Sequence, residues 1–540
     1  MMPDAAQPAA DAGTHATLPW WHGASIYQIY PRSFLDTNGD GIGDLPGITA
    51  GLDHVAALNV DAIWLSPFFT SPMQDFGYDV SDYRGVDPIF GTLDDFDALV
   101  TRAHDLGLKI IIDQVWSHTS DQHAWFRESR QSRVNDKADW YVWADPKPDG
   151  TPPSNWQSVF GGPAWTWDAR RQQYYLHNFL TTQPDLNLHN PAVQEAILGV
   201  ARFWLERGVD GFRIDAINFA MHDPELRDNP PASGNHKRTR PFDFQNRIHN
   251  MSHPDIPLFL ERVAGVVNSF SERFTVAEVG GDNAIAEMHE FTAGAARLNS
   301  AYGFNFLYAD QLDARTVADA LAEWPDTPGT GWPSWAFSNH DAPRAASRWH
   351  GMCPHDDYAR LIMLLLVALR GNIFLYYGEE LGLTQAEIGF EDLQDPEAIA
   401  NWPLTLGRDG ARTPMPWTAN AANAGFSTGK PWLPLGADHA SRAVDAQCAD
   451  PASMLHWTRG LMALRRSQPE LRHGSVTVAV AQGDQLVLHR DWAGQRLVCA
   501  FNLGAAPISV DLPPATILAQ HGGASLARLP AYSGLIALCA

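Results

Sequence analysis

Four short apolar runs of the sequence lead into acidic or histidine residues, the side-chain types that carry out acid–base and nucleophilic chemistry. The residues in question lie at 113–118, 215, 278 and 340–341. Carboxylates and histidines that meet on one rim would suit the cleavage of an acetal. One carboxylate attacks, a second protonates the departing oxygen, and the other groups orient the sugar ring. This chemistry requires a fold that brings the ends of the runs together.

The spacing of the apolar runs indicates which fold could do this. Eight such runs alternate with helical stretches, and this alternation is typical of parallel βα units. The runs lie at 25–30, 62–66, 109–115, 211–215, 274–279, 301–306, 334–338 and 372–377. They predict an α/β fold, a (β/α)8 TIM barrel, in which residues at the carboxyl ends of the strands point into a shared site.

Two parts of the chain do not fit the alternation of strands and helices in a barrel. The segment between the third and fourth runs is far longer than the usual βα connection of about two to six residues, which predicts an inserted subdomain after the third strand. After a long polar loop at 384–443 and a helix at 454–467, the pattern changes to a period of two, which predicts a C-terminal antiparallel β domain. The predicted division is a disordered tail at 1–18, the barrel at 19–117 and 189–460, the inserted domain B at 118–188, and the C-terminal domain at 461–540.

Composition narrows the classes of partner and compartment. Lys+Arg number 38 against 62 Asp+Glu, and the resulting net charge of −24 disfavours nucleic acid and anionic membrane surfaces as partners. No apolar run reaches the roughly 18 residues of a membrane helix, and the N-terminus lacks the basic start and apolar core of a signal peptide. The 4 cysteines form no C-x-x-C pair, which is typical of reduced thiols. We expect a cytoplasmic protein, with a homodimer as a plausible assembly.

The motifs together resemble those of glycoside hydrolase family 13, the α-amylase family, and within it the oligo-1,6-glucosidase and α-glucosidase group. The resemblance covers the chain from about Trp20 to the C-terminus and follows the order of the family's motifs. The matching strings are DQVWSH at 113–118, QPDLN at 183–187, GFRID at 211–215, the glutamate at 278 and NHD at 339–341. The resemblance implies small-molecule α-glucosides as substrates and sugar or alcohol acceptors.

The resemblance implies a role for each acid. Asp215 corresponds to the nucleophile that forms a β-linked glucosyl-enzyme, and Arg213 to the cation that holds it ionised, so we expect a low pKa for Asp215. Glu278 corresponds to the general acid, whose carboxyl must stay protonated near neutrality. Asp341 corresponds to the third acid, which holds the sugar hydroxyls as the ring flattens toward the oxocarbenium ion.

Further residues match the family's first sugar pocket. The resemblance makes Tyr78 a stacking platform and pairs Asp75 with Arg412 behind the non-reducing end of the substrate. A pocket closed in this way accepts one terminal glucose, which implies exo action on short substrates.

Other matches concern the bound ring and its linkage. His118 and His340 would donate to hydroxyls of the same ring, and Phe179 would border the pocket from the inserted domain. Ala216 follows the nucleophile at a position where relatives acting on α-1,6 bonds usually carry Val, whereas those acting on α-1,4 bonds carry Ala, Gly or Thr. We therefore expect a preference for α-1,4 bonds, with maltose as the simplest substrate and a discrimination of about 1–3 kcal/mol.

One acidic, glycine-rich loop has the oxygen-donor spacing of a calcium site. The five donors would be Asp36, Asn38, Asp40, the backbone carbonyl of Ile42, and Asp44. An EF-hand is disfavoured because its twelfth position is Gly47 and no helix pair flanks the loop. The same string forms a structural metal site in this glucosidase group, which implies bound Ca2+ or Mg2+ and no organic cofactor. The second calcium site of α-amylases is not expected, because Ser117 replaces the usual Asn.

The sequence leaves the acceptor of the glucosyl group open between water and a hydroxyl compound. We favour a retaining exo-acting α-glucosidase with strong transglucosylation. A glucoside isomerase of the sucrose isomerase or trehalose synthase type is the alternative, although the segment 342–345 lacks the charged Arg-Leu-Asp-Arg-Asp loop of sucrose isomerisation. A non-catalytic partner of a transporter is disfavoured, because the catalytic acids are retained and no membrane helix is present.

Overall fold

The structure is a computed structural model that describes residues 18–233, 240–327, 329–403 and 407–540. The predicted disordered tail at 1–18 lies outside the described residues, apart from Leu18. Among the described helices, none is both long enough and apolar enough to cross a membrane.

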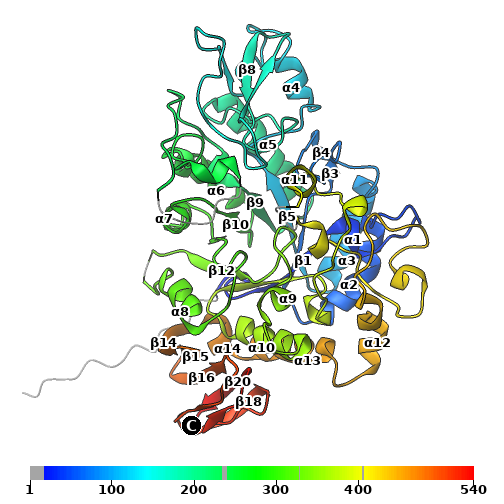
Figure 1. The fold of residues 1–540 in the computed structure, drawn as a ribbon, viewed down its shortest axis with the longest axis vertical. Helices are drawn as coiled ribbons and strands as arrows, with labels where there is room; N and C mark the ends of the chain where they lie inside the picture. Colours follow the sequence, from blue (N-terminus) through cyan, green and yellow to red (C-terminus); the bar gives the residue numbers. More distant parts are fainter. Residues whose placement is uncertain (1–17, 234–239, 328, 404–406) are drawn as a thin grey trace, which may run out of the picture.

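Eight parallel strands close into the predicted barrel (Figure 1). Their order around the barrel is β1-β13-β12-β11-β10-β9-β5-β2. Each barrel strand therefore pairs with the barrel strands that come before and after it in the chain, and the first pairs with the last. The strands are β1 (Ser25–Ile29), β2 (Ala62–Leu65), β5 (Lys109–Val115), β9 (Gly211–Asp215), β10 (Phe274–Glu278), β11 (Ser300–Tyr302), β12 (Trp332–Ala336) and β13 (Asn372–Tyr376). The predicted fold class is confirmed.

The sixth strand differs most from its predicted range, 301–306. It ends at Tyr302 because the chain then leaves the barrel wall, and the following residues Phe304 and Tyr308 reach the cavity described below. Its early end therefore supplies side chains to the site.

Helices surround the barrel, and several begin at side-chain caps. Asp44, Asn190 and Asp313 each accept a backbone amide from the first turn of a helix, and Thr92 forms a reciprocal capping box with Asp95. The helices are α1 (Pro31–Phe34), α2 (Leu45–Ala56), α3 (Leu93–Asp105), α5 (Pro191–Glu206), α6 (Ile256–Val267), α7 (Ala284–Phe291), α8 (Ala314–Ala322), α9 (Ala345–Trp349), α10 (His355–Ala368), α11 (Pro396–Asn401) and α12 (Val444–Ala449).

The inserted segment between β5 and β9 forms a small layer at one end of the barrel (Figure 1). Its antiparallel sheet has the order β6-β8-β7 and packs on its own apolar cluster, which includes Trp156 and Trp165. The elements are α4 (Ala124–Ser129), β6 (Trp143–Ala144), β7 (Trp165–Asp168) and β8 (Gln173–Leu176). A hairpin of β3 (Phe69–Thr70) and β4 (Asp82–Val86) lies in the preceding βα connection.

The C-terminal domain lies at the opposite end of the molecule from the inserted segment (Figure 1). Its five-stranded antiparallel sheet has the order β14-β15-β16-β20-β18, and the buried Arg490 donates to the carbonyls of Ala368 and Leu471 at its junction with the barrel. The elements are α13 (Met454–Ser467), α14 (Pro469–His473), β14 (Ser475–Gln482), β15 (Gln485–Trp492), β16 (Gln495–Asn502), β17 (Ile508–Ser509), β18 (Ala515–His521), β19 (Arg528–Leu529) and β20 (Ser533–Cys539).

Candidate active site

A cavity of about 330 Å3 lies where the carboxyl ends of the barrel strands meet the inserted segment. The predicted residues that line it are Asp75, Tyr78, His118, Phe179, Asp215, Ala216, Glu278 and Asp341. The fold therefore brings the three predicted catalytic acids into one cavity. Arg213, His340 and Arg412 are buried behind it, with at most 1% of each residue exposed.

One guanidinium group organises the acids on the barrel side of the cavity. Arg213 pairs through Nη1 with Asp113 at 2.7 Å and with Asp215 at 2.5 Å, and through Nη2 with Glu278 at 2.5 Å. Arg213 and Asp215 lie two residues apart on β9, so their side chains point to the same side of the strand. The phenol of Tyr302 on β11 accepts from Arg213 Nε at 3.0 Å and donates to Glu278 at 3.1 Å.

Burial dominates the ionisation of this cluster. It raises the pKa of Asp215 to about 7, that of Glu278 to about 7 and that of Asp113 to about 6. The expected low pKa of Asp215 is therefore wrong. Arg213 divides one positive charge among three carboxylates, so its attraction does not offset the desolvation of any one of them. The arrangement favours retention of a proton by the carboxyl cluster near neutral pH.

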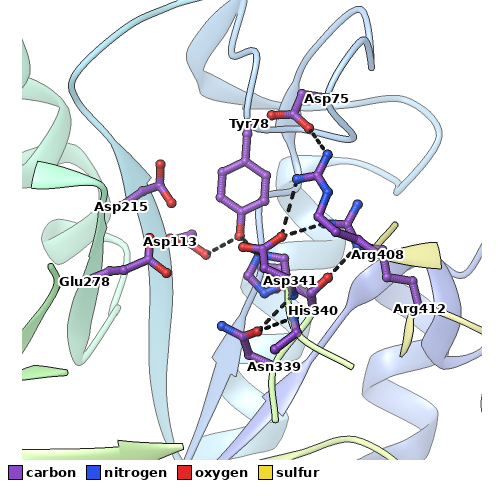
Figure 2. A network of polar contacts seen from close by, with 12 residues as sticks. Asp75, Tyr78, Asp113, Asp215, Glu278, Asn339, His340, Asp341, Arg408 and Arg412 are labelled. Atoms are coloured by element: carbon purple, nitrogen blue, oxygen red, sulfur yellow. Dashed lines mark hydrogen bonds and ion pairs between the residues drawn. The ribbon is translucent and has the colours of Figure 1, made fainter. Parts of the chain in front are cut away.

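Asp341 has the opposite environment, across the cavity from Asp215 and Glu278 (Figure 2). The side-chain oxygen of Asn339 accepts the amides of Asp341 and Ala342, both at 2.9 Å, and this turn projects Asp341 from the end of β12. Burial opposes its ionisation, but His340 and three arginines hold the pKa of Asp341 well below its usual range. Asp341 is therefore a fixed negative charge.

Asp75, Tyr78 and Asp341 form what we call the floor of the cavity. The arginine that closes this floor is Arg408, whereas the sequence predicted Arg412. Arg408 Nη2 pairs with Asp75 at 2.9 Å and with Asp395 at 2.8 Å, and Arg408 Nη1 lies 3.3 Å from Asp341 (Figure 2). Arg412 instead bonds Asp341 at 2.7 Å and the carbonyl of His340 at 2.6 Å. The prediction that Arg412 pairs with Asp75 is wrong because the loop at 384–443 places Arg408 between the two carboxylates.

The floor is built on a tight turn that carries Asp75 and Tyr78. Asp79 accepts the amides of Gln74 and Asp75 at 2.8 and 3.0 Å, and the turn passes through the left-handed Phe76, with φ of 51°. Tyr78 stacks on the His340 ring with a centroid distance of 5.3 Å and an interplanar angle of 1°. The phenol of Tyr78 donates to Asp113 at 3.1 Å.

The two histidines have different positions. His118 lines the cavity and contacts Phe179 at 5.0 Å between ring centroids, while its Nε2 lies 3.1 Å from the carbonyl of Tyr78. His340 is buried beside the cavity and does not line it, and its predicted contact with a sugar ring stays a prediction. Its Nδ1 accepts from Gln28, which leaves the Nε2 proton to hold Tyr78 at 2.5 Å and Asp341 at 3.2 Å.

The mouth of the cavity is aromatic. Phe160 and Phe179 come from the inserted segment, whereas Phe304 and Tyr308 follow β11. The mouth is completed by Phe219, Phe242, Met251 and the ion pair between Arg240 and Glu397, whose atoms lie 3.4 Å apart. Ala216 borders this side in a left-handed conformation with φ of 38°.

Sequence reasoning missed several residues that position the site. Gln183 belongs to the recognised QPDLN string and donates to Asp75 at 3.2 Å, so that string contained a signal for it. Tyr302, Arg408, Arg240 and Glu397 belong to no motif that the sequence reasoning recognised. Only the fold shows that their segments face the cavity.

The predicted metal loop is closed by hydrogen bonds. Asp36 accepts the amides of Asn38, Gly39 and Gly41 and the hydroxyl of Ser427. Asp44 accepts the amide of Gly47 at 2.7 Å as the cap of α2. The set of oxygen donors suits a hard cation, but within the described chain the three loop carboxylates do not gather within 4.8 Å of one another. The metal site stays a prediction.

Comparisons with known proteins agree on the family. Residues 28–474 match the family described as "Alpha amylase, catalytic domain", and residues 474–536 match a "Domain of unknown function (DUF3459)". A "Probable alpha-glucosidase" of Rhizobium meliloti (strain 1021) is 52% identical over 96% of this chain and 97% of the relative. An "Oligo-1,6-glucosidase" of Heyndrickxia coagulans is 36% identical over 92% of this chain and 94% of the relative.

Two solved structures cover this chain almost completely. A crystal structure of an "alpha-glucosyl transfer enzyme" has a TM-score of 0.92 and 50% identity, and the match covers 97% of this chain and 100% of that one. The trehalulose synthase from Pseudomonas mesoacidophila MX-45 has a TM-score of 0.89 and 32% identity, with the same coverage. The similar proteins thus include hydrolases, a transferase and an isomerase on one scaffold.

Proposed function

The chain belongs to the α-amylase family, glycoside hydrolase family 13, and we propose that it is a retaining, exo-acting α-glucosidase with strong transglucosylation. The observation that carries this proposal is the contrast within one cavity between a closed, charged floor and an aromatic mouth. The floor would hold a terminal glucose, and the mouth would hold first the leaving group and then the acceptor.

The positions of the two acids around Arg213 support a double-displacement mechanism. Asp215 attacks the anomeric carbon as the glycosidic bond breaks, and Glu278 transfers its proton to the departing oxygen. Glu278, now a carboxylate, then takes the proton of water or of an acceptor hydroxyl as that oxygen displaces Asp215. Each cycle returns the proton to Glu278, so the cluster needs one proton shared between these two carboxyls.

The floor supports exo action. Asp75, Arg408 and Asp341 form a continuous chain of ion pairs at 2.9 and 3.3 Å, and Tyr78 presents its ring beside it. A polysaccharide cannot continue beyond a floor that is closed in this way. We therefore propose that the glucose at the non-reducing end binds there.

The mouth supports transfer to a hydroxyl compound. Aromatic faces pack against the C–H faces of sugars and against apolar alcohols, and their rings reduce the access of water to the glucosyl-enzyme. The side chain of Ala216 occupies little of this region, and this supports a preference for α-1,4 bonds and for maltose.

The decisive measurement is the free glucose formed per maltose consumed, at early times, with and without a simple alcohol. Cleavage releases one glucose and hydrolysis of the glucosyl-enzyme releases a second, so hydrolysis gives about two glucose per maltose. We expect a value nearer to one when the alcohol is present, together with a new α-glucoside. A ratio of about two that the alcohol leaves unchanged would contradict transfer.

A glucoside isomerase is the second candidate, and the similarity to the trehalulose synthase favours it. An isomerase would convert sucrose into an isomeric disaccharide with little free glucose, because the released sugar is retained and attacked again. In this chain Arg344, within the segment 342–345, is buried and donates to the carbonyls of Tyr377 and Ala411. Arg344 does not line the cavity, so the segment 342–345 places no charged side chain where an acceptor would bind. We therefore rank isomerisation second.

A further inference from the structure

Two histidines and an aspartate meet outside the active-site cavity, between the inserted segment and the barrel. His189 lies just before α5, and His253 and Asp255 lie in the loop that precedes α6. One donor atom from each of the three lies within 4.8 Å of the other two, and no other such group of His, Cys, Asp or Glu occurs in the described parts of the chain. This cluster is separate from the acidic loop at 36–44.

A hydrogen bond indicates which nitrogen atom of His189 is available. His189 Nε2 lies 2.7 Å from the carbonyl of His222, which can only accept, so Nε2 carries the proton and Nδ1 has a free lone pair. A backbone carbonyl that orients an imidazole in this way is a common outer partner of metal-binding histidines. The His189 and His253 rings lie 4.8 Å apart between centroids and are nearly perpendicular, at 87°.

His253 and Asp255 face each other without a proton between them. His253 Nδ1 accepts the amide of Asp255 at 3.2 Å, so it is unprotonated, and it lies 3.8 Å from the Asp255 carboxylate. A neutral imidazole has a single nitrogen lone pair, so a cation at the cluster would take the place of this amide on Nδ1.

Asp255 does not cap the helix that follows it, although its position in the chain is that of an N-cap residue. It occupies the cap position of α6, yet its side chain makes no capping hydrogen bond, whereas Asp44, Asn190 and Asp313 all cap their helices. Its side chain is 56% exposed, so a cation could reach the cluster from solvent.

We propose that His189, His253 and Asp255 form a binding site for a divalent cation of the zinc type. Two imidazoles and one carboxylate suit a borderline cation such as Zn2+, with water in the remaining position, whereas Ca2+ and Mg2+ prefer oxygen donors alone. The cation would connect the end of the inserted segment to the loop before α6. That loop also carries Met251 of the cavity mouth, so the cation would restrain one wall of the acceptor region.

The test is a titration of the metal-stripped full chain with Zn2+ by calorimetry, alongside the melting temperature. We expect one equivalent of Zn2+ to bind and to raise the melting temperature, since a cation that binds only the folded chain stabilises it. Excess Ca2+ should leave the Zn2+ affinity unchanged. Co2+ should bind with the visible absorption of a nitrogen- and oxygen-ligated ion.

Variants assign the site to its residues. Asp255→Asn and His253→Gln should each lower the Zn2+ affinity at least tenfold. Asp255→Asn removes an exposed carboxylate, so its glucose release from maltose without Zn2+ should match that of the wild type. The matched control is His249→Gln in the same loop, whose imidazole lies 3.4 Å from Asp223 and outside the cluster.

The possible outcomes separate a built site from adventitious binding to the chain's 21 histidines. Full affinity in Asp255→Asn and His253→Gln, or an equal loss in His249→Gln, would overturn the proposal. Absence of stoichiometric Zn2+ binding would also overturn it.

Discussion

The floor and the mouth of the cavity differ in the chemistry of their side chains: the floor is charged, whereas the mouth is mainly aromatic. On the floor, Asp341 is held by Arg408, Arg412 and His340, and each interaction is within 3.3 Å. At the mouth, the side chains are mainly aromatic, and the ion pair between Arg240 and Glu397 is 3.4 Å long. A charged network accepts one arrangement of hydroxyl groups, whereas aromatic faces tolerate many shapes. For the proposed function, we therefore expect strict selection of the glucose and loose selection of its acceptor.

The largest effect should come from the nucleophile. Asp215→Asn keeps the shape of the side chain but removes the carboxylate that attacks the anomeric carbon, so turnover should be abolished for hydrolysis and transfer alike. Glucose release from maltose measures the first, and formation of the alcohol glucoside measures the second. Retained turnover of either kind would remove Asp215 from this role.

Glu278→Gln should have the next largest effect, and its size should depend on the leaving group. General acid catalysis contributes about 10²–10⁴-fold, so maltose cleavage should fall by that factor. An aryl α-glucoside whose phenol leaves without protonation should form the glucosyl-enzyme at a nearly unchanged rate. An equal loss with both substrates would contradict the assignment of Glu278 as the acid.

The same pair of acids sets the pH dependence. The raised pKa values of Asp215 and Glu278, both about 7, predict a bell-shaped profile of kcat/KM near neutral pH. Activity falls on the acid side as Asp215 becomes protonated and on the alkaline side as Glu278 loses its proton. In Glu278→Gln, assayed with the aryl glucoside, the alkaline limb should disappear, and its persistence would assign that limb to another group.

The floor and the mouth can be compared directly by removing one arginine from each. Arg408→Met leaves the carboxylates of Asp75 and Asp395 buried without their cation, and loss of one partner of a buried pair costs about 3–5 kcal/mol. If the whole cost falls on catalysis, kcat/KM for maltose should fall roughly 10²- to 10⁴-fold. Arg240→Met, whose side chain is 28% exposed, should cost less than about tenfold. Similar losses in the two variants would remove the distinction between floor and mouth.

The predictability of the site follows the same division. The acids could be predicted because barrel strands place their last residues on one rim, so local strings such as GFRID locate Arg213 and Asp215 in space. Asp75 and Tyr78 of the floor lie outside the barrel strands and were predicted only from the resemblance to the family. The partner of Asp75 was assigned to Arg412 instead of Arg408, because both lie in a long loop whose path is fixed by tertiary contacts. The mouth was least predictable, since side chains such as Phe304 and Tyr308 come from segments between motifs. The prediction of a low pKa for Asp215 failed because the sequence neighbours of Asp215 do not reveal how deeply its carboxyl group is buried.

Ala216 tests the linkage preference at the boundary between floor and mouth. Ala216→Val should raise the activity on isomaltose relative to maltose by an amount worth about 1–3 kcal/mol. The left-handed φ of 38° adds a cost, because a β-branched residue is strained in this conformation, so the activity on both substrates should also decrease. Ala216→Gly is the control, since glycine adopts this conformation freely. An unchanged ratio in Ala216→Val would show that the linkage is selected elsewhere.

The smallest expected effect concerns the aromatic mouth alone. Tyr308 is 58% exposed and stacks on Phe304 with ring centroids 5.1 Å apart, so Tyr308→Ala should leave the fold intact. An aromatic contact contributes about 0.5–1.5 kcal/mol, so transfer to the alcohol should fall only several-fold while the hydrolysis of maltose changes little. The glucose formed per maltose should therefore move toward two. Phe390→Ala, a 50% exposed aromatic that does not line the cavity, should leave the ratio unchanged. If Tyr308→Ala instead reduced hydrolysis and transfer equally, the mouth would bind the leaving group and not select the acceptor.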